Sequence, residues 1–326
     1  MINAGIAGLG WWGRTLVNAV QSKSEAIRFV QAAVRDPAKS AEYAQSQGLS
    51  LASDYEALLD NPEVDAVVLA TPHSVHTEQV LAAAAARKHV FCEKPLAMSR
   101  AEAERMVRAC QDAGVILAVG QNKRFWASMV ELRKIVDSGD LGTILHIESH
   151  SSNQNSANFS AWREDPQEAP GGGMTGSGVH ILDAMVSVAG SVATVNASLM
   201  TQRSGADPRD TITALMTFQN GISGTLAAVR ATPLYWRVHV FGDQGSVESL
   251  SETQLVVRKS GGVVEHREVP AINSVFSELE AFALAIRGEA PFPITTQDMV
   301  ETAAAFEAIL QSVRTGQTVR LKEEAP

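Results

Sequence analysis

Short apolar runs alternate with amphipathic segments along the first third of the chain. The runs at 2–7, 29–34 and 66–70 have the length of strands, and the last is apolar throughout. Continuous apolar runs are typical of parallel strands that are buried on both faces. The alternation continues with helical patterns at 14–21, 37–47, 78–86 and 101–113, and with strand patterns at 89–92 and 115–119. This order predicts βαβ units that share one parallel sheet.

The pattern changes near residue 121, after which one helix is expected at 129–136 and strands then dominate. The expected strands lie at 143–150, 192–200, 212–218, 222–229, 238–241, 247–250, 254–257 and 263–269. Further helices are expected at 179–188, 274–287 and 296–314. The sequence therefore predicts an α/β protein with an N-terminal Rossmann domain (1–122), built on a doubly wound parallel sheet. A C-terminal α+β domain (123–326) is expected to hold a large, mostly antiparallel, open sheet.

Composition narrows the class of protein and its partners. The chain has 326 residues and is 45% apolar, which is enough for two domains with a core each. Its formal net charge of -9 argues against nucleic acid or an anionic membrane as a partner, because both attract clustered Lys and Arg. Cys92 and Cys110 are not spaced as metal ligands, and the N-terminus has no signal-peptide pattern. We therefore expect a cytoplasmic protein without a metal site.

A glycine motif follows the first expected strand. Residues 8–13 read GLGWWG and fit the pattern G-x-G-x-x-G. In that pattern the first glycine permits a tight turn, the second lets the backbone approach a pyrophosphate, and the third lets helix pack on strand. A glycine-rich turn without a ligand is the alternative, but the βαβ context favours dinucleotide binding. Cofactor contacts are expected from Gly8, Gly10, Trp11, Trp12 and Gly13.

The choice between NAD and NADP depends on the end of the second expected strand. An acidic residue there would bind the ribose 2′-OH of NAD, whereas an arginine suits the 2′-phosphate of NADP. If the strand ends at Val34, the next side chain is Arg35, which favours NADP. Asp36 is the alternative ribose ligand, although its place before Pro37 also makes it a helix N-cap. We expect NADP as the preferred cofactor and NAD as the alternative.

Several further motifs make the chain resemble the Gfo/Idh/MocA oxidoreductases, the family of glucose–fructose oxidoreductase and inositol dehydrogenase. They are Ala70-Thr71-Pro72, His76, Glu93-Lys94-Pro95, Gly120-Gln121-Asn122 and Gly178-Val179-His180-Ile181-Leu182-Asp183. The resemblance covers nearly the whole chain. It implies two domains, a nicotinamide cofactor, and a sugar, polyol or related alcohol or ketone as the small-molecule substrate. It also implies that the open sheet forms homodimers or homotetramers.

Hydride transfer at a hydroxyl or carbonyl carbon needs a group that takes or gives the proton of the oxygen. Lys94 is the expected acid/base, because strand ends at this edge of the sheet face the ligand crevice. A solvated surface lysine is the alternative. The resemblance places His180 beside the substrate oxygen, with Asp183 one turn away on the same helix face; a core histidine is the alternative. Glu93 is expected to hold the cofactor or to fix Lys94.

The remaining site predictions follow from position along the same loops. Arg124 follows the turn at Gly120, from which a side chain can reach the crevice, and Trp162 and Arg163 precede a triple glycine. The alternative for Trp162 and Arg163 is a packed aromatic ring beside a surface arginine, and a role outside the site is equally open for Arg124. Further cofactor contacts are expected from Thr71, Pro72, His73, His76 and Gln121. Further substrate contacts are expected from Asn122, Arg124, Trp162, Arg163 and Asp183.

Gly176 departs from the family's pattern, in which many polyol dehydrogenases have an aspartate four residues before the histidine. The incomplete lysine–aspartate–histidine trio argues against a typical inositol-type substrate, though not against hydride transfer. Two other classes of function stay open at this point. One is a protein that binds the cofactor without catalysis, as a sensor or scaffold. The other is a nicotinamide-assisted lyase or glycosidase, which oxidises its substrate only transiently.

Overall fold

The structure, a computed structural model, describes residues 1–152, 165, 167–201, 211–230 and 232–321. It consists of two compact units. The first unit contains Met1–Asn122 and Asn273–Met299, and the second contains Lys123–Ile272 and Val300–Pro326. Each unit is built around its own sheet.

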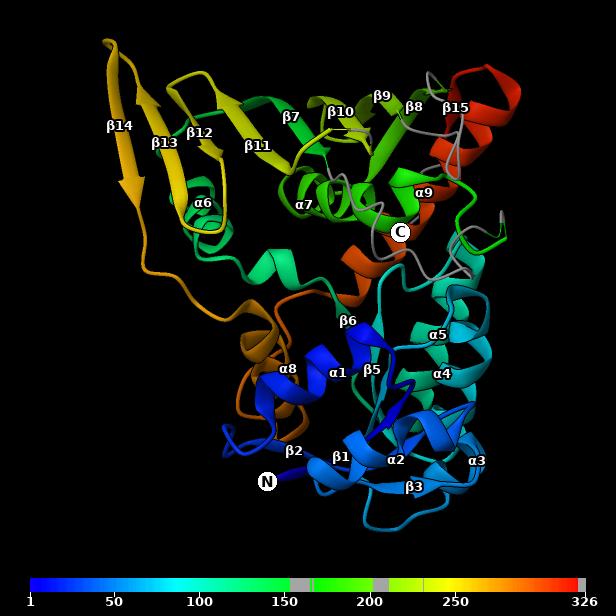
Figure 1. The fold of residues 1–326 in the computed structure, drawn as a ribbon. Coiled ribbons are helices and arrows are strands. Elements are labelled where there is room, and N and C mark those ends of the chain that lie inside the picture. Colours follow the sequence, from blue (N-terminus) through cyan, green and yellow to red (C-terminus); the bar gives the residue numbers. More distant parts are fainter. Residues whose placement is uncertain (153–164, 166, 202–210, 231, 322–326) are drawn as a thin grey trace. The chain divides into compact units, whose positions relative to one another are not determined.

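The first unit holds a parallel six-stranded sheet in the order β3-β2-β1-β4-β5-β6. Its strands are β1 (Ile2–Ala7), β2 (Ile27–Ala33), β3 (Ser50–Ala52), β4 (Ala66–Leu69), β5 (His89–Glu93) and β6 (Leu117–Gly120). Its helices are α1 (Trp11–Val20), α2 (Pro37–Ser46), α3 (Tyr55–Leu59), α4 (His76–Ala85), α5 (Arg100–Ala113) and α8 (Ser274–Ile286). Figure 1 shows α1 and α8 on one face of the sheet and α4 and α5 on the other. This is the predicted doubly wound arrangement, and the expected Rossmann domain is confirmed.

The first unit recruits a helix from late in the sequence. Val275, Leu279 and Phe282 of α8 belong to the same buried core as Ile6 of β1. The ring of Phe282 lies 5.7 Å, centroid to centroid, from the ring of Phe91 on β5. The sequence-based boundary assigned everything after residue 122 to the second domain and so did not include this return. The apolar face of α8 explains it, because that face covers the sheet beside α1.

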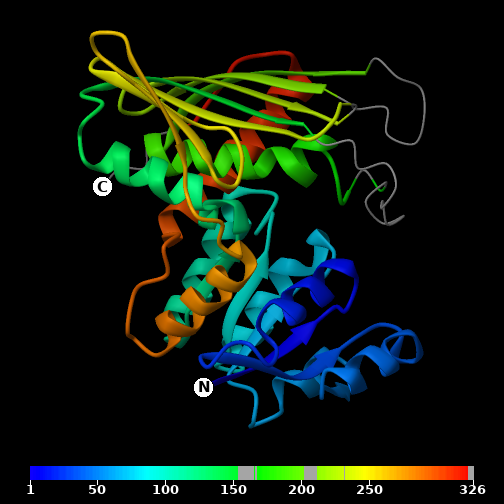
Figure 2. The ribbon, with the colours of Figure 1, turned by 60° about the vertical axis from the view of Figure 1, so that its left-hand side comes forward.

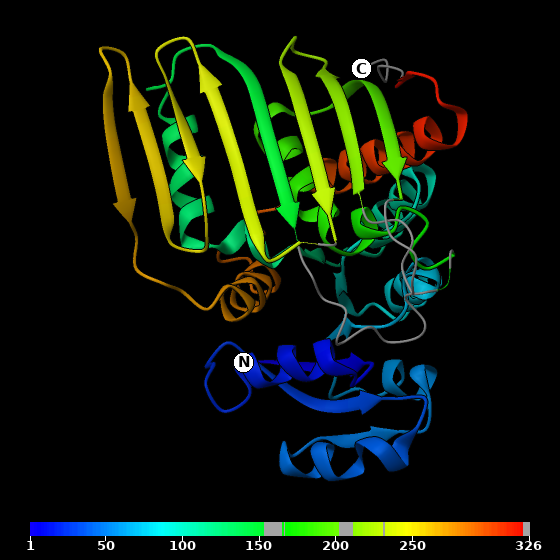
Figure 3. The ribbon, with the colours of Figure 1, turned by 45° about the horizontal axis from the view of Figure 1, so that its top comes forward.

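The second unit holds a nine-stranded sheet in the order β14-β13-β12-β11-β7-β10-β9-β8-β15. Its strands are β7 (Ile144–Ser152), β8 (Val192–Met200), β9 (Thr211–Phe218), β10 (Ser223–Val229), β11 (Tyr235–Gly242), β12 (Gly245–Ser249), β13 (Gln254–Lys259), β14 (Val263–Glu268) and β15 (Val319–Arg320). Only the pair β7–β10 is parallel among the described strands of this sheet. The expected large, mostly antiparallel sheet is therefore confirmed, and Figure 3 shows its strands side by side.

Helices cover one face of the large sheet and leave the other open (Figure 2). They are α6 (Ala127–Asp137), α7 (Val179–Ala189) and α9 (Thr296–Thr315). Along β9 the buried positions alternate with exposed ones, as in a strand with one face toward a core and one toward solvent. None of the helices in the described ranges is long and apolar enough to cross a membrane.

Candidate functional site

The carboxyl ends of parallel strands bring most of the expected site residues of the first unit to one edge of its sheet. The glycine loop follows β1, Thr71 follows β4, and Gln121 follows β6. Glu93 is the last residue of β5. The order β3-β2-β1-β4-β5-β6 reverses direction between β1 and β4. In doubly wound sheets a ligand binds outside the strand ends at this reversal.

The glycine loop shows a different reason for each of its three glycines. Gly8 has φ +95°, and a Cβ there would lie 2.5 Å from the carbonyl oxygen of Ala70. A Cβ on Gly13 would lie 2.0 Å from the carbonyl oxygen of Gly8. Gly10 has φ -68°, and a Cβ on it would meet nothing within 4 Å. The first and third glycines are therefore required by packing, whereas the second leaves open space above the loop.

That open space lies at the start of α1, where Gly10 is the N-cap and offers no side chain to cap the helix. The first N–H groups of a helix have no partner within it and carry a partial positive charge. This combination suits a pyrophosphate. Two buried polar atoms, Nε1 of Trp12 and Oε1 of Gln121, have no hydrogen-bond partner among the residues described. Because buried polar groups are nearly always paired, the unit fits a polar ligand such as a dinucleotide.

His76 ties two loops of this edge together. Its side chain is fully buried, with Nδ1 3.0 Å from the carbonyl oxygen of Pro95 and Nε2 3.2 Å from that of Thr71. A neutral imidazole has one N–H and can donate to only one of them. The hydroxyl of Thr71 donates to Oε1 of Gln79 at 2.6 Å. These contacts give His76 a structural role beside Lys94–Pro95, a cis peptide.

The cofactor contacts expected of Thr71, Pro72, His73 and His76 stay predictions. The ring of His73 lies 5.7 Å from that of His76, centroid to centroid. Among the described residues no three His, Cys, Asp or Glu side chains converge as metal ligands do.

Glu93 and Lys94 are neighbouring charged residues at the end of β5. Glu93 is only 6% exposed, and its Oε2 accepts a hydrogen bond from the backbone N–H of Lys94 at 3.2 Å. A Cβ on Gly120 of β6 would lie 2.4 Å from Oε1 of Glu93. Glycine is therefore needed beside this carboxylate, which explains the family motif at Gly120. Lys94 itself is half-buried at the strand end.

A second buried carboxyl group belongs to the same unit and was not identified from the sequence. Glu278 of α8 is 0% exposed. Burial raises the pKa of Glu278 well above its usual value, the negative charge of Glu93 raises it further, and the positive charge of Lys94 opposes the shift. The available signal was its position in the apolar stripe of a helix, where a charged residue is rare.

The segment after β2 separates the two candidate ribose ligands. β2 ends at Ala33, and Arg35 is exposed. Asp36 caps α2: its Oδ1 accepts from the backbone N–H of Lys39 at 3.4 Å, and its Oδ2 lies 3.2 Å from Nζ of the same lysine. These interactions lower the pKa of Asp36. The predicted N-cap is thus confirmed. The strand ends one residue earlier than expected, so Val34 follows it directly and Arg35 is the second residue after the strand.

In the second unit His180, Asp183 and Arg124 are gathered around α7. The helix is entered through a π-helical turn, Met174–Gly178 (η5). His180 and Asp183 are both buried, with Asp183 only 1% exposed. Nε of Arg124 lies 3.4 Å from Oδ2 of Asp183. The buried carboxylate is therefore neutralised by the guanidinium, and the structure brings together these three expected residues.

The other residues predicted to contact the substrate are Asn122, Trp162 and Arg163, and Gly176 is the position that departs from the family's pattern. Asn122 begins a 3-10 turn, Asn122–Phe125, and its contact with substrate stays a prediction. Trp162 and Arg163 lie outside the described residues. Gly176 is exposed in the π-helical turn, and a Cβ there would meet nothing within 4 Å. Packing among the described residues therefore does not exclude an aspartate at this position.

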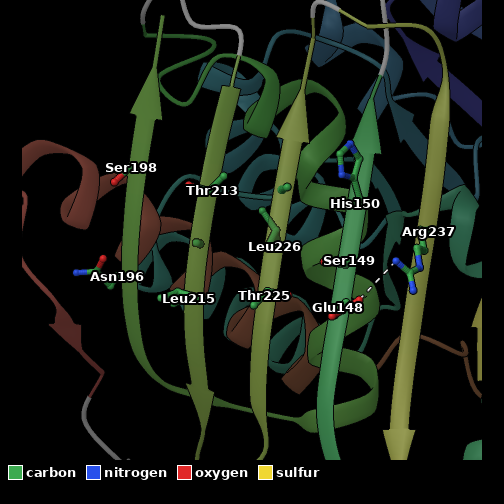
Figure 4. Close-up of a pocket in the computed structure, with 12 residues that line it drawn as sticks. Glu148, Ser149, His150, Asn196, Ser198, Thr213, Leu215, Thr225, Leu226 and Arg237 are labelled. Carbon is green, nitrogen blue, oxygen red and sulfur yellow. Dashed lines mark ion pairs between the residues drawn. The ribbon is translucent and has the colours of Figure 1, made fainter. Parts of the chain in front are cut away.

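A hollow on the large sheet lies away from these residues. It is formed by β7 to β11 on the open face, and an ion pair of 3.5 Å joins Glu148 of β7 to Arg237 of β11 (Figure 4). Its side chains also include His150, Thr213 and Leu215. Because α7 covers the opposite face, we do not assign this hollow to the same site as His180.

Two matched variants of the glycine loop test the proposed phosphate site. Gly10→Ala should fold with wild-type thermal stability, because its Cβ enters open space, yet weaken nicotinamide dinucleotide binding by roughly tenfold or more by obstructing the phosphates. Gly13→Ala should lower the free energy of unfolding, because its Cβ would collide with backbone. Calorimetric titration measures the dinucleotide affinity of each variant, and urea unfolding measures its free energy of unfolding. Unchanged dinucleotide affinity in folded Gly10→Ala would contradict the phosphate site.

Comparison with known proteins identifies the family of the chain. The family described as "Oxidoreductase family, NAD-binding Rossmann fold" matches residues 2–121, and the GFO/IDH/MocA C-terminal domain matches residues 129–248. Inositol 2-dehydrogenase 2 of Saccharopolyspora erythraea is 30% identical over 97% of this chain and 94% of its own.

Two solved structures agree with these matches. Aldose-aldose oxidoreductase from Caulobacter crescentus, complexed with glycerol, is 28% identical with a TM-score of 0.87 over 98% of this chain and 99% of that chain. Levoglucosan dehydrogenase in complex with NADH and levoglucosan shares the fold at 24% identity, with a TM-score of 0.88 over 98% of this chain and 99% of that chain. The protein is thus a member of the GFO/IDH/MocA oxidoreductase family, with an NAD-binding Rossmann fold.

Proposed function

We propose that the protein is an NAD(P)-dependent dehydrogenase or reductase that acts on a CH–OH group, or its carbonyl form, in a sugar, polyol or related molecule. The observation that carries this proposal is the placement of Lys94 beside buried Glu93, on the same sheet edge as the glycine loop. The names of the relatives support the substrate class, since they include an inositol dehydrogenase and a levoglucosan dehydrogenase.

A bound nicotinamide dinucleotide would supply the acceptor or donor of the hydride. The residues that would hold it are the glycine loop, Gln121 and the segment that begins at Thr71. Lys94 takes the hydroxyl proton during oxidation and returns a proton during reduction. The carboxylate of Glu93 accepts a hydrogen bond from the backbone N–H of Lys94 and so holds Lys94 at the end of β5.

His180 is the second residue that transfers the proton. The buried pair of Arg124 and Asp183 fixes the helical turn from which the imidazole projects. Loss of Arg124 would leave the buried carboxylate of Asp183 without this compensating charge. Asn122, Arg124, Trp162 and Arg163 complete the proposed set that recognises the substrate, together with Asp183.

We assign NADP as the preferred cofactor. Asp36 is engaged as a helix cap and by Lys39, so its carboxylate is less suited to bind a ribose hydroxyl. Arg35 is exposed, two residues after the end of β2, and a guanidinium near that strand end is suited to bind a 2′-phosphate. The NADH bound by levoglucosan dehydrogenase makes NAD the alternative.

We also propose a cytoplasmic protein that self-associates through the open face of the large sheet. Both cysteines are free and buried, which fits a reducing compartment. The open face exposes large apolar side chains, including Met200, Leu215 and Tyr235. Their partner would be the same face of a second copy, giving a homodimer or homotetramer.

Lys94→Met is the variant that tests the proton transfer. We expect kcat/KM to fall by roughly 10²- to 10⁴-fold, the usual contribution of a general acid/base, while dinucleotide affinity stays close to wild type. Initial rates come from the absorbance of the reduced nicotinamide across sugars, polyols and their keto forms. The control is Lys134→Met, an exposed lysine on α6. Wild-type turnover in Lys94→Met would remove Lys94 as the acid/base.

The same assay separates the competing classes. Substrate consumption without net change in nicotinamide absorbance would indicate a nicotinamide-assisted lyase or glycosidase. Tight cofactor binding without consumption of any substrate would favour a sensor or scaffold.

Arg35→Ala tests the cofactor assignment. It should weaken NADPH binding by roughly 10- to 100-fold, the loss expected for charge-assisted hydrogen bonds, and leave NADH binding nearly unchanged. Arg28→Ala is the control on the same segment, because its guanidinium donates to Asn3 instead. If wild type prefers NADH and Asp36→Ala rather than Arg35→Ala loses affinity, the ribose ligand is Asp36.

Leu215→Lys tests the association of copies. Leu215 of β9 is 62% exposed on the open face, so a lysine there leaves the fold intact and opposes contact between two such faces. Sedimentation equilibrium should show a dimer or tetramer for wild type and a marked shift to monomer for the variant. A monomeric wild-type protein would contradict this assignment.

A further inference from the structure

The buried stripe of α8 contains one residue that does not belong to an apolar core. Val275, Leu279, Phe282 and Ala283 lie at helical spacing and are buried. Glu278 lies on the same face and is 0% exposed. Neither of its carboxyl oxygens has a hydrogen-bond partner among the residues described. An unpaired buried carboxyl group destabilises the fold, and it does so far more as a charge than as a neutral acid.

The packing of α8 on the sheet directs Glu278 toward Glu93. Phe282, one turn after Glu278, packs its ring on Phe91. Glu93 is two residues after Phe91 on β5, so its side chain points to the same face of the sheet. Two residues along the strand and one turn of the helix span similar lengths. This register places the two carboxyl groups opposite one another.

The charged groups that surround Glu278 are few. Glu93 and Lys94 are the residues whose charges act on it. Of the neighbouring elements, α1 contributes Arg14, whose Nε donates to the carbonyl of Leu9. β2 contributes Arg28, whose Nε donates to Asn3. Among the described residues, the charges that act on buried Glu278 are thus those of buried Glu93 and half-buried Lys94.

We propose that Glu278 is a positioning residue that stays protonated and presents a neutral polar carboxyl group to ionised Glu93, so that Glu93 and Lys94 form a balanced pair. This inference rests on the proposed role of Lys94 and names a residue that controls it. Burial and the charge of Glu93 both raise the pKa of Glu278, and both therefore favour its neutral form. An ionised Glu278 would add a second negative charge and hold the proton on Lys94 more firmly.

The two variants that separate this role from core filling are Glu278→Gln and Glu278→Met. The glutamine keeps a neutral polar group of the same shape, whereas the methionine keeps volume but no polar hydrogen. Without that group Glu93 is more readily protonated, and Lys94 then releases its own proton more easily. The matched control is Glu280→Gln, on the same helix, where the carboxylate accepts from Ser24.

The direct measurement is the titration of Lys94 by NMR after reductive methylation with a carbon-13 label, with the signal assigned by its absence in Lys94→Met. We expect Glu278→Met to move this titration to lower pH by roughly half a unit or more, and Glu278→Gln and Glu280→Gln to leave it in place. An unchanged titration in folded Glu278→Met overturns the proposal. This experiment needs no substrate, so its failure is distinct from failure of the proposed reaction.

Thermal stability gives a second readout. The pKa of Glu278 is raised in the folded state, so its protonated form favours folding below the ordinary carboxyl pKa, and this advantage is lost as pH rises toward the raised value. The melting temperature of Glu278→Gln relative to wild type should therefore increase from acid to neutral pH. A constant difference, together with no infrared band of a protonated carboxyl assigned to Glu278, would show that Glu278 is ionised and would overturn the proposal.

Discussion

The close approach of the loop after β1 to the loop after β4 is the constraint on which the candidate site depends. Gly8 adopts a positive φ, and its Cα lies so near the carbonyl of Ala70 that no Cβ fits. Gly13 lies as tightly against Gly8. These contacts aim the N-terminus of α1 at the sheet edge where β4, β5 and β6 also end. Any side chain that filled this space would displace the helix and the polar groups that depend on it.

The same edge concentrates charge in a poorly solvated place. Glu93 is held between β5 and the bare backbone of Gly120, and Lys94 follows it at the surface of the unit. His76 fixes the next loop through the carbonyl of Pro95. α8 returns from the far end of the sequence and adds Glu278 beneath this pair. Elements from both ends of the chain therefore build the core of the unit that carries Lys94.

The sequence predicted the elements that have strong local signals. The apolar run at 66–70 and the cap at Asp36 were readable, because each depends on neighbours in sequence. The short elements β3, α3 and β15 were missed, because they are too short for a repeating pattern of apolar residues to be recognised. The packing of α8 on the first sheet could not be predicted from the local sequence, because an apolar helix face does not indicate which sheet it covers.

The candidate site was predictable to a similar extent. The resemblance to the family suggested Lys94 and His180, whose roles stay predictions, and the grouping of His180 with Asp183 followed from helical geometry. The ion pair with Arg124 and the bridging role of His76 depend on tertiary contacts and required the structure. Glu278 carried a signal, a carboxyl group within an apolar helical stripe, whose meaning became clear only beside Glu93.

The central claim is that the first unit binds a nicotinamide dinucleotide for hydride transfer. Calorimetric titration of folded, cofactor-free protein with NADPH and, separately, with NADH tests it most directly. We expect saturable binding of one dinucleotide per chain, with either NADPH or NADH bound more tightly than the other. Absence of binding to either, in protein shown to be folded and free of bound nucleotide, would contradict it.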